Sequence, residues 1–210
     1  MKIKINNILL SFLAIALLMV CETVFAFYGV GYSSFPLQRD NKMVGVEMTG
    51  VIADGGGLGI QARYTHKTSK RAIVDAGLNV SGGDRNARIF AGLDYEIIPD
   101  YLKQPRVSLK ATLENSHEFS FRRNILGLIP TVSKGFNVKG NEVYPYLAIP
   151  MGISLHSDNG TYKNVMNISV GANGAIPFKG YRHLTGNVEG MVNLKDSYTG
   201  VFAGISFPMN

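Results

Sequence analysis

A histidine and a serine three residues apart, His117 and Ser120, stand close to two carboxylates, Glu114 and Glu118. A histidine near a hydroxyl and a carboxylate is the raw material of a nucleophilic site, in which the imidazole activates the attacking oxygen. Side chains three residues apart point to opposite faces of a continuing strand, so this pair could meet only if the segment forms a loop. Polar loop residues without a catalytic role are the competing interpretation, which the spacing favours.

The same segment carries positive charge. His117, Arg122 and Arg123 would form a basic outer loop if the chain turns here. Arginine binds phosphate oxygens through two parallel hydrogen bonds, so such a loop could meet the phosphates of lipopolysaccharide. Solvated surface charge is the simpler interpretation and stays open.

Other chemistry is less well supported. His66, His156 and His183 lack the spaced partners of a metal site, so we predict no metal and no cofactor. The glycines of residues 55–59 precede alternating residues rather than a helix, which indicates a hairpin and not a phosphate-binding loop. The chain has a net charge of +6, but its Lys and Arg are scattered, which disfavours nucleic-acid binding.

The residues between these candidates alternate between apolar and polar over long stretches, which predicts β-strands. Turn-forming residues separate the stretches. The predicted strands cover residues 43–53, 56–66, 71–81, 87–98, 106–116, 124–136, 142–156, 163–176, 183–195 and 198–207. A further strand is possible at 27–34. Pro130, Pro145 and Pro150 fall inside predicted strands and must lie at bulges or strand ends, because proline cannot donate to the strand ladder.

The polar faces of these strands carry charges of both signs. In a closed barrel with its apolar face outward, these side chains would pair inside a narrow lumen, where Gly59, Gly77 and Gly92 leave room. The predicted lumen network consists of Arg63, Asp75, Asp94, Glu96, Lys110 and Glu114. Periodicity alone also allows the inverse arrangement, a soluble barrel with an apolar interior.

Two further features favour the membrane arrangement. The predicted strands have the length that a tilted strand needs to cross a bilayer. Tyrosines fall near their ends, where they could form interfacial girdles: Tyr64, Tyr95, Tyr101, Tyr144, Tyr162, Tyr181 and Tyr198. A barrel of eight or ten strands would have a lumen filled by side chains, so no wide pore is expected.

The N-terminus has the pattern of a secretory signal. Lys2 and Lys4 precede an apolar run, and Val24-Phe25-Ala26 fits signal peptidase cleavage. We therefore predict a cleaved signal at residues 1–26 and one domain at residues 27–210. Cys21 is not preceded by the small residue of a lipidation site and would be removed with the signal, which leaves a mature chain without cysteine.

Over residues 27–210 the pattern resembles the small outer-membrane β-barrel proteins of Gram-negative bacteria. The last strand alternates through Val201, Ala203, Ile205 and Phe207, similar to the assembly signal of that family, although Pro208, Met209 and Asn210 follow the aromatic residue.

The resemblance implies a closed, antiparallel, up-and-down transmembrane barrel of eight to ten strands in the outer membrane, with both termini periplasmic. Its partners would be outer-membrane lipid, lipopolysaccharide and the assembly machinery, and its role structural or surface-interacting. A lipid A-modifying enzyme resembling the barrel deacylases, and a soluble periplasmic barrel that binds an apolar ligand, remain alternatives.

Overall fold

The computed structural model describes residues 28–52, 56–83, 87–118, 121–138, 140–156, 160–178 and 180–209. The predicted signal at residues 1–26 and the serine at position 120 lie outside these ranges, as does the side chain of residue 121. No helix among the described residues is long and apolar enough to cross a membrane.

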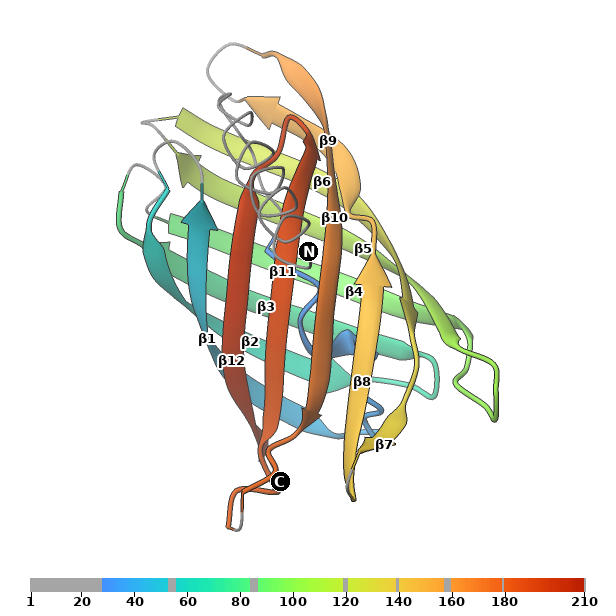
Figure 1. The fold of residues 1–210 in the computed structure, drawn as a ribbon. Helices are drawn as coiled ribbons and strands as arrows, with labels where there is room; N and C mark the ends of the chain where they lie inside the picture. The colour runs from blue at the N-terminus through green and yellow to red at the C-terminus, as the bar shows by residue number, and fades with distance from the viewer. Residues whose placement is uncertain are drawn as a thin grey trace, which may run out of the picture.

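The strands form one closed antiparallel barrel with ten positions around its wall (Figure 1). Closure is made by the first and last strands, which pair from Lys42 opposite Met209 to Ile52 opposite Thr199. The elements are η1 Gly31–Ser34, β1 Lys42–Ile52, β2 Leu58–Lys67, β3 Ala72–Ser81, β4 Ala87–Ile98, β5 Arg106–Glu118, β6 Phe121–Ser133, β7 Phe136–Val138, β8 Asn141–Ala148, β9 Met151–His156, β10 Tyr162–Ala175, β11 Thr185–Lys195 and β12 Thr199–Met209. The fold class is therefore as the alternation predicts.

Two short strands, β8 and β9, share one position in the wall, because both pair with β6 on one side and β10 on the other. The strand predicted at 142–156 is thus interrupted at Ile149 and Pro150. β7 extends this position as a short hairpin with β8.

The interruption accommodates two of the three prolines. The carbonyl of Pro130 accepts a hydrogen bond from Ile149 N (3.1 Å), at the point where β6 changes partner from β9 to β8. The carbonyl of Pro150 accepts from Asn167 N (2.8 Å), beside a register shift in β10. Pro145 lies within β8, next to the place where its pairing with β6 ends. The missing donors therefore fall at breaks in the ladder.

Residues 28–37, which we name the plug, lie inside the ring of strands (Figure 1). The possible strand at 27–34 is wrong for the described residues of that range. Gly29 and Gly31 have φ of +82° and +72°, which breaks an extended conformation, and a 3₁₀ turn follows. Tyr28, Val30 and Tyr32 are all 1 % exposed or less.

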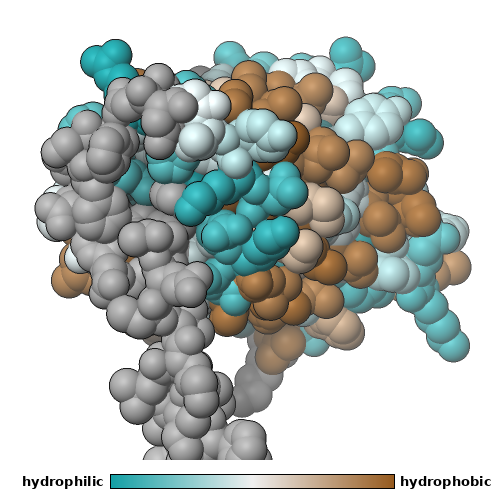
Figure 2. Space-filling view, turned by 90° about the horizontal axis from the view of Figure 1, so that it is seen from above, coloured by the Kyte–Doolittle hydropathy of each residue, from teal (hydrophilic) through white to brown (hydrophobic). Residues whose placement is uncertain are grey.

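The outer face of the wall is apolar all the way round, whereas the inner face carries the buried polar and charged residues together with a few apolar clusters. One residue from each of the ten positions illustrates the outer face, with exposures from 46 % to 64 %: Val46, Ile60, Leu78, Leu93, Leu113, Leu126, Ile153, Val170, Val188 and Val201. Seen from above, a group of teal hydrophilic residues lies near the middle of the view with brown hydrophobic residues beside it, and further teal residues stand at the outer edge (Figure 2). The period of two in each strand produces the difference between the two faces.

Candidate functional site: the occupied lumen

The lumen is built around Arg63 of β2, which is 2 % exposed. Its Nη1 lies 2.7 Å from Asp75 Oδ2, and its Nη2 lies 3.2 Å from Glu47 Oε2. The same Nη2 donates to the carbonyl of Tyr28 in the plug (2.9 Å). Adjacent strands supply the three side chains, since β2 pairs with both β1 and β3. The Arg63 guanidinium thus binds a carboxylate on each of the two neighbouring strands and a carbonyl of the plug.

Lys110 of β5 makes the corresponding contact from the other side. Its Nζ lies 2.6 Å from Asp75 Oδ2 and donates to the carbonyl of Val30 (3.0 Å). Asp75 therefore bridges two cations that each hold a plug carbonyl. A buried carboxylate is retained in its charged form when such partners compensate its desolvation.

Glu189 of β11 binds the plug through its backbone amides. Its carboxylate accepts hydrogen bonds from Val30 N (2.9 and 3.0 Å to the two oxygens) and Gly31 N (3.3 Å). Tyr146 Oη donates to the same carboxylate (2.9 Å), and Ser169 also bonds it. Asn173 donates to the carbonyl of Gly31 (3.0 Å). The barrel thus supplies hydrogen-bond partners for the buried peptide groups of Val30 and Gly31.

Aromatic stacking fixes the start of the plug. The rings of Tyr28 and Phe90 lie 4.0 Å apart and nearly parallel, with Arg63 5.2 Å and Lys110 4.9 Å from the Tyr28 ring. Cations at these distances are attracted by the ring face. The Tyr28 side chain, hydroxyl included, is fully buried in the lumen. Gly92 leaves the space that this hydroxyl occupies, since a Cβ there would overlap it.

A second ion-paired group lies toward the end where β5 and β6 meet. Arg88 Nε is 2.9 Å from Glu114 Oε1, and Arg88 donates to Tyr198 Oη (2.6 Å). Arg123 lies 3.4 Å from Glu118 and also bonds Ser154. A third group lies at the opposite end, where Arg106 pairs with Asp94 and with Glu96 (3.0 Å).

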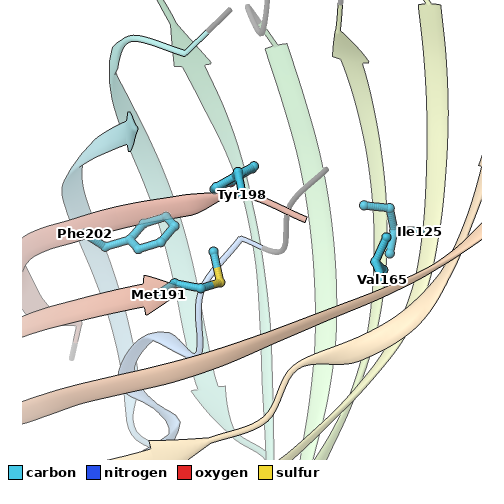
Figure 3. Packing of buried hydrophobic residues seen from close by; sticks show 5 residues of the cluster. All are labelled: Ile125, Val165, Met191, Tyr198 and Phe202. Carbon is cyan, nitrogen blue, oxygen red and sulfur yellow. The ribbon is translucent and has the colours of Figure 1, made fainter. Parts of the chain in front are cut away.

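Apolar residues fill the lumen on both sides of the charged layer. Toward the β11–β12 connection, five buried residues from β6, β10, β11, β12 and the connection itself form one cluster: Ile125, Val165, Met191, Tyr198 and Phe202 (Figure 3). At the other end, Tyr32 and Leu37 of the plug pack with Met43 and Ile73, and Phe35 lies against them. Among the described residues, the lumen thus holds apolar clusters toward both ends and ion-paired groups between them.

The structure places the six residues of the predicted network inside the barrel, where they belong to three separate groups. Arg63, Asp75 and Lys110 meet at the plug, whereas Asp94 and Glu96 meet at Arg106. Glu114 belongs to the Arg88 group instead. The network prediction lacked Glu47, Arg88 and Glu189, although each lies on the inward register of its strand. It also lacked the plug, for which the paired glycines and tyrosines at 28–32 were the available signal.

The expected basic outer loop is divided between two faces of the wall. Residues 117–123 were predicted to be a loop, but β5 runs to Glu118 and β6 starts at residue 121. His117 and Arg122 face one another across the two strands on the exposed outer side. Arg123 is 1 % exposed and lies in the lumen. The alternation of inward and outward residues continues to the ends of β5 and β6. Arg123 and Glu118 both face inward there and form an ion pair.

The same register separates the candidate nucleophilic group. His117 is exposed on the outer face, whereas Glu114 and Glu118 are 4 % exposed and point inward. The barrel wall therefore stands between the imidazole and both carboxylates, and Ser120 lies outside the described residues. Among the described residues, no group of three or more His, Cys, Asp or Glu side chains is placed to hold a metal ion.

Only some of the tyrosines predicted to form girdles lie on the outer surface. Tyr64, Tyr95, Tyr101, Tyr162 and Tyr181 are exposed, with fractions from 37 % to 71 %. Tyr144 is half-buried, and Tyr198 lies in the lumen against Arg88. The predicted assembly residues Val201, Ala203, Ile205 and Phe207 all lie on the exposed face of β12, which continues through Pro208 to Met209.

In comparisons with known proteins, the chain shows similarity to solved structures alone. No protein-family model matches the chain, and no curated protein matches it. Among solved structures, the chain is similar to one from the de novo design of transmembrane β-barrels, at 14 % sequence identity and a TM-score of 0.39. The alignment covers 83 % of this chain and 100 % of the designed one.

Proposed function

We propose that this protein is an outer-membrane β-barrel with a structural or surface-interacting role, whose lumen is closed by residues 28–37. The observation that carries the proposal is that the barrel is apolar on its outer face and charged in its interior, the reverse of a soluble barrel. Exposed apolar side chains surround the wall, while Glu47, Arg63 and Lys110 are each 2 % exposed or less inside it. A soluble barrel that binds an apolar ligand would need the opposite arrangement.

The lengths of the strands support insertion into a bilayer. The nine uninterrupted strands contain 10–14 residues. A tilted strand of about 9–11 residues crosses the hydrocarbon layer, and a closed barrel leaves no unpaired edge in it. The N-terminal secretory pattern and the alternating last strand support delivery to the outer membrane by the assembly machinery, where the lipid partners include lipopolysaccharide.

The occupied lumen supports a role other than transport. The plug is held by both its carbonyls and its amides, through Arg63, Lys110 and Glu189. Solutes would have to displace these bonds and the apolar residues at either end. We therefore assign the function to the wall and the rims of the barrel.

The test is reconstitution of the mature chain into lipid vesicles, with two readouts. Migration on a denaturing gel before and after boiling reports whether the barrel has folded in the bilayer. Swelling of the vesicles in small sugars reports solute passage. We expect a shift in migration on boiling and no swelling above that of empty vesicles. Failure to leave the aqueous phase would overturn the membrane assignment, and swelling at the rate of a porin would overturn the closed lumen.

A further inference from the structure

One end of the barrel carries most of the surface charge. We name this end, where β1 begins and β12 ends, the terminal rim. It consists of residues 38–42, of the segments that join β2 to β3, β4 to β5, β6 to β8 and β10 to β11, and of the strand-end residues Lys67 and Glu142 beside them. Its described basic side chains are Arg39, Lys42, Lys67, Lys70, Arg71, Lys103, Lys134 and Arg182, and its described acidic side chains are Asp40, Asp100 and Glu142.

The acidic residues of the rim are already engaged. Asp40 lies 3.6 Å from Arg39, Asp100 pairs with Lys134, and Glu142 accepts a hydrogen bond from Tyr144 Oη (2.9 Å). The other six basic residues of the rim form no ion pair within the part of the chain that the structure describes: Lys42, Lys67, Lys70, Arg71, Lys103 and Arg182.

The opposite end does not share this charge. Outside the lumen, the described charged residues near that end are Arg122, Lys163, Lys195 and Asp196. In the sequence, the stretches between the same strands add Arg85 and three acidic residues, Asp54, Asp84 and Asp158, so basic and acidic residues are equal in number. The positive field is therefore a property of one rim, not of the whole surface.

Backbone hydrogen bonds place four basic residues of the rim on neighbouring elements: Lys42, Lys67, Lys70 and Arg71. Asp40 N donates to the carbonyl of Lys67 (2.9 Å), and Lys67 N donates to the carbonyl of Asn41 (3.0 Å). Lys42 is therefore held beside the β2–β3 turn, which carries Lys70 and Arg71. These four basic residues therefore lie on neighbouring elements of the rim.

Exposed aromatic and apolar side chains accompany the charges. Tyr101 and Leu102 precede Lys103 and are 69 % and 79 % exposed, and Tyr181 precedes Arg182 at 58 % exposure. Aromatic residues with adjacent basic residues are typical of the level at which a membrane protein meets lipid headgroups. The apolar wall begins immediately beyond them, at Tyr64 and Tyr95 on the outer face.

We propose that the terminal rim binds the phosphate groups of anionic phospholipid headgroups. The inference rests on the proposed function, since the rim meets headgroups only if the barrel spans a bilayer. Each basic residue near an anionic membrane surface raises the association constant for that surface by roughly fivefold. A zwitterionic headgroup offers no net charge to this field, so the rim selects phosphatidylglycerol over phosphatidylcholine.

The experiment measures which lipid the reconstituted protein prefers. The mature chain is folded into phosphatidylcholine bilayers that contain a trace of spin-labelled phosphatidylglycerol or spin-labelled phosphatidylcholine, and the relative association constant of the two is determined. We expect a preference of several-fold for phosphatidylglycerol in the unaltered protein. The preference should approach unity in the triple variant K67Q/K70Q/R71Q.

The matched control is R122Q/K163Q/K195Q, which removes three positive charges from the opposite end. We expect it to keep the preference. Equal loss in both variants, or no preference in the unaltered protein, would overturn the proposal. If the rim variant does not fold, a salt titration of the unaltered protein decides, because the preference must weaken as salt screens the rim. Normal insertion without lipid preference would reject only this inference, whereas absence of insertion would reject the proposed function.

Discussion

At the scale of single residues, Arg63 connects the barrel wall to the plug, because it binds Glu47, Asp75 and the carbonyl of Tyr28. Its substitution R63M would remove the cation paired with Glu47 and one of the two cations paired with Asp75, which would keep Lys110. Removing one member of a buried ion pair costs about 3–5 kcal/mol. We expect a loss of stability of that order in urea unfolding from detergent micelles.

The control for this change is R39M. Arg39 pairs with Asp40 at the surface, where both side chains are more than half exposed, and exposed pairs contribute less than about 1 kcal/mol. Equal stability of R63M and R39M would contradict the role assigned to the lumen network.

Gly31 allows a second residue-scale prediction. A Cβ at this position would overlap the Arg63 guanidinium, and its φ is +72°. Gly140 has a similar φ of +81°, yet nothing lies within 4 Å of its added Cβ. Both G31A and G140A therefore incur backbone strain of about 1–2 kcal/mol, but only G31A must also displace the plug.

The measurement is protease cleavage near the plug in detergent-solubilised protein. We expect cleavage at residues 28–40 to be accelerated in G31A and unchanged in G140A. If both variants resist cleavage like the unaltered chain, the tight contact between Gly31 and Arg63 is not what seats the plug.

At the scale of elements, the sequence predicts the ten strand positions well, because alternation depends only on which face of the wall each residue occupies. Pro150 interrupts one position but does not remove it, since β8 and β9 keep the same neighbours. The plug could not be predicted in this way. Its fold depends on side chains from distant strands, such as Lys110 and Glu189, that satisfy its peptide groups.

The sequence also predicts part of the candidate site. Inward charges such as Arg63 and Asp75 follow from the alternation, but which carboxylate pairs with which cation depends on register between strands. Arg123 was placed on a loop because nothing local indicates that β5 and β6 continue to residues 118 and 121. Its pairing with Glu118 is formed only after both strands have paired.

Deletion of residues 28–36 tests the plug as an element. Val30 and Tyr32 are buried, and a large apolar side chain contributes about 1.5–3 kcal/mol when fully buried. We expect a barrel that still folds but is destabilised by several kcal/mol, and that passes ions across a planar bilayer where the unaltered protein does not. A folded deletion variant without conductance would show that the remaining side chains seal the lumen alone.

At the scale of the whole molecule, the separation of an apolar exterior from a charged interior is the property on which the account depends. A charged side chain facing lipid at the middle of a bilayer costs about 2–4 kcal/mol. The wall avoids this by directing Lys110 and Glu114 inward on the same strand that exposes Leu113. The same period of two thus stabilises the lumen and defines the surface that meets lipid.

The most direct test of this property is fluorescence quenching at Leu113, which is 62 % exposed near the middle of β5. The mature chain as predicted has no cysteine, so L113C can be labelled alone with a small fluorophore. A label at Q104C, in the exposed connection between β4 and β5, is the matched control. We predict that lipids brominated on their acyl chains quench the label at residue 113, whereas aqueous iodide quenches the label at residue 104. Quenching of the residue 113 label by iodide but not by brominated lipid would contradict the account.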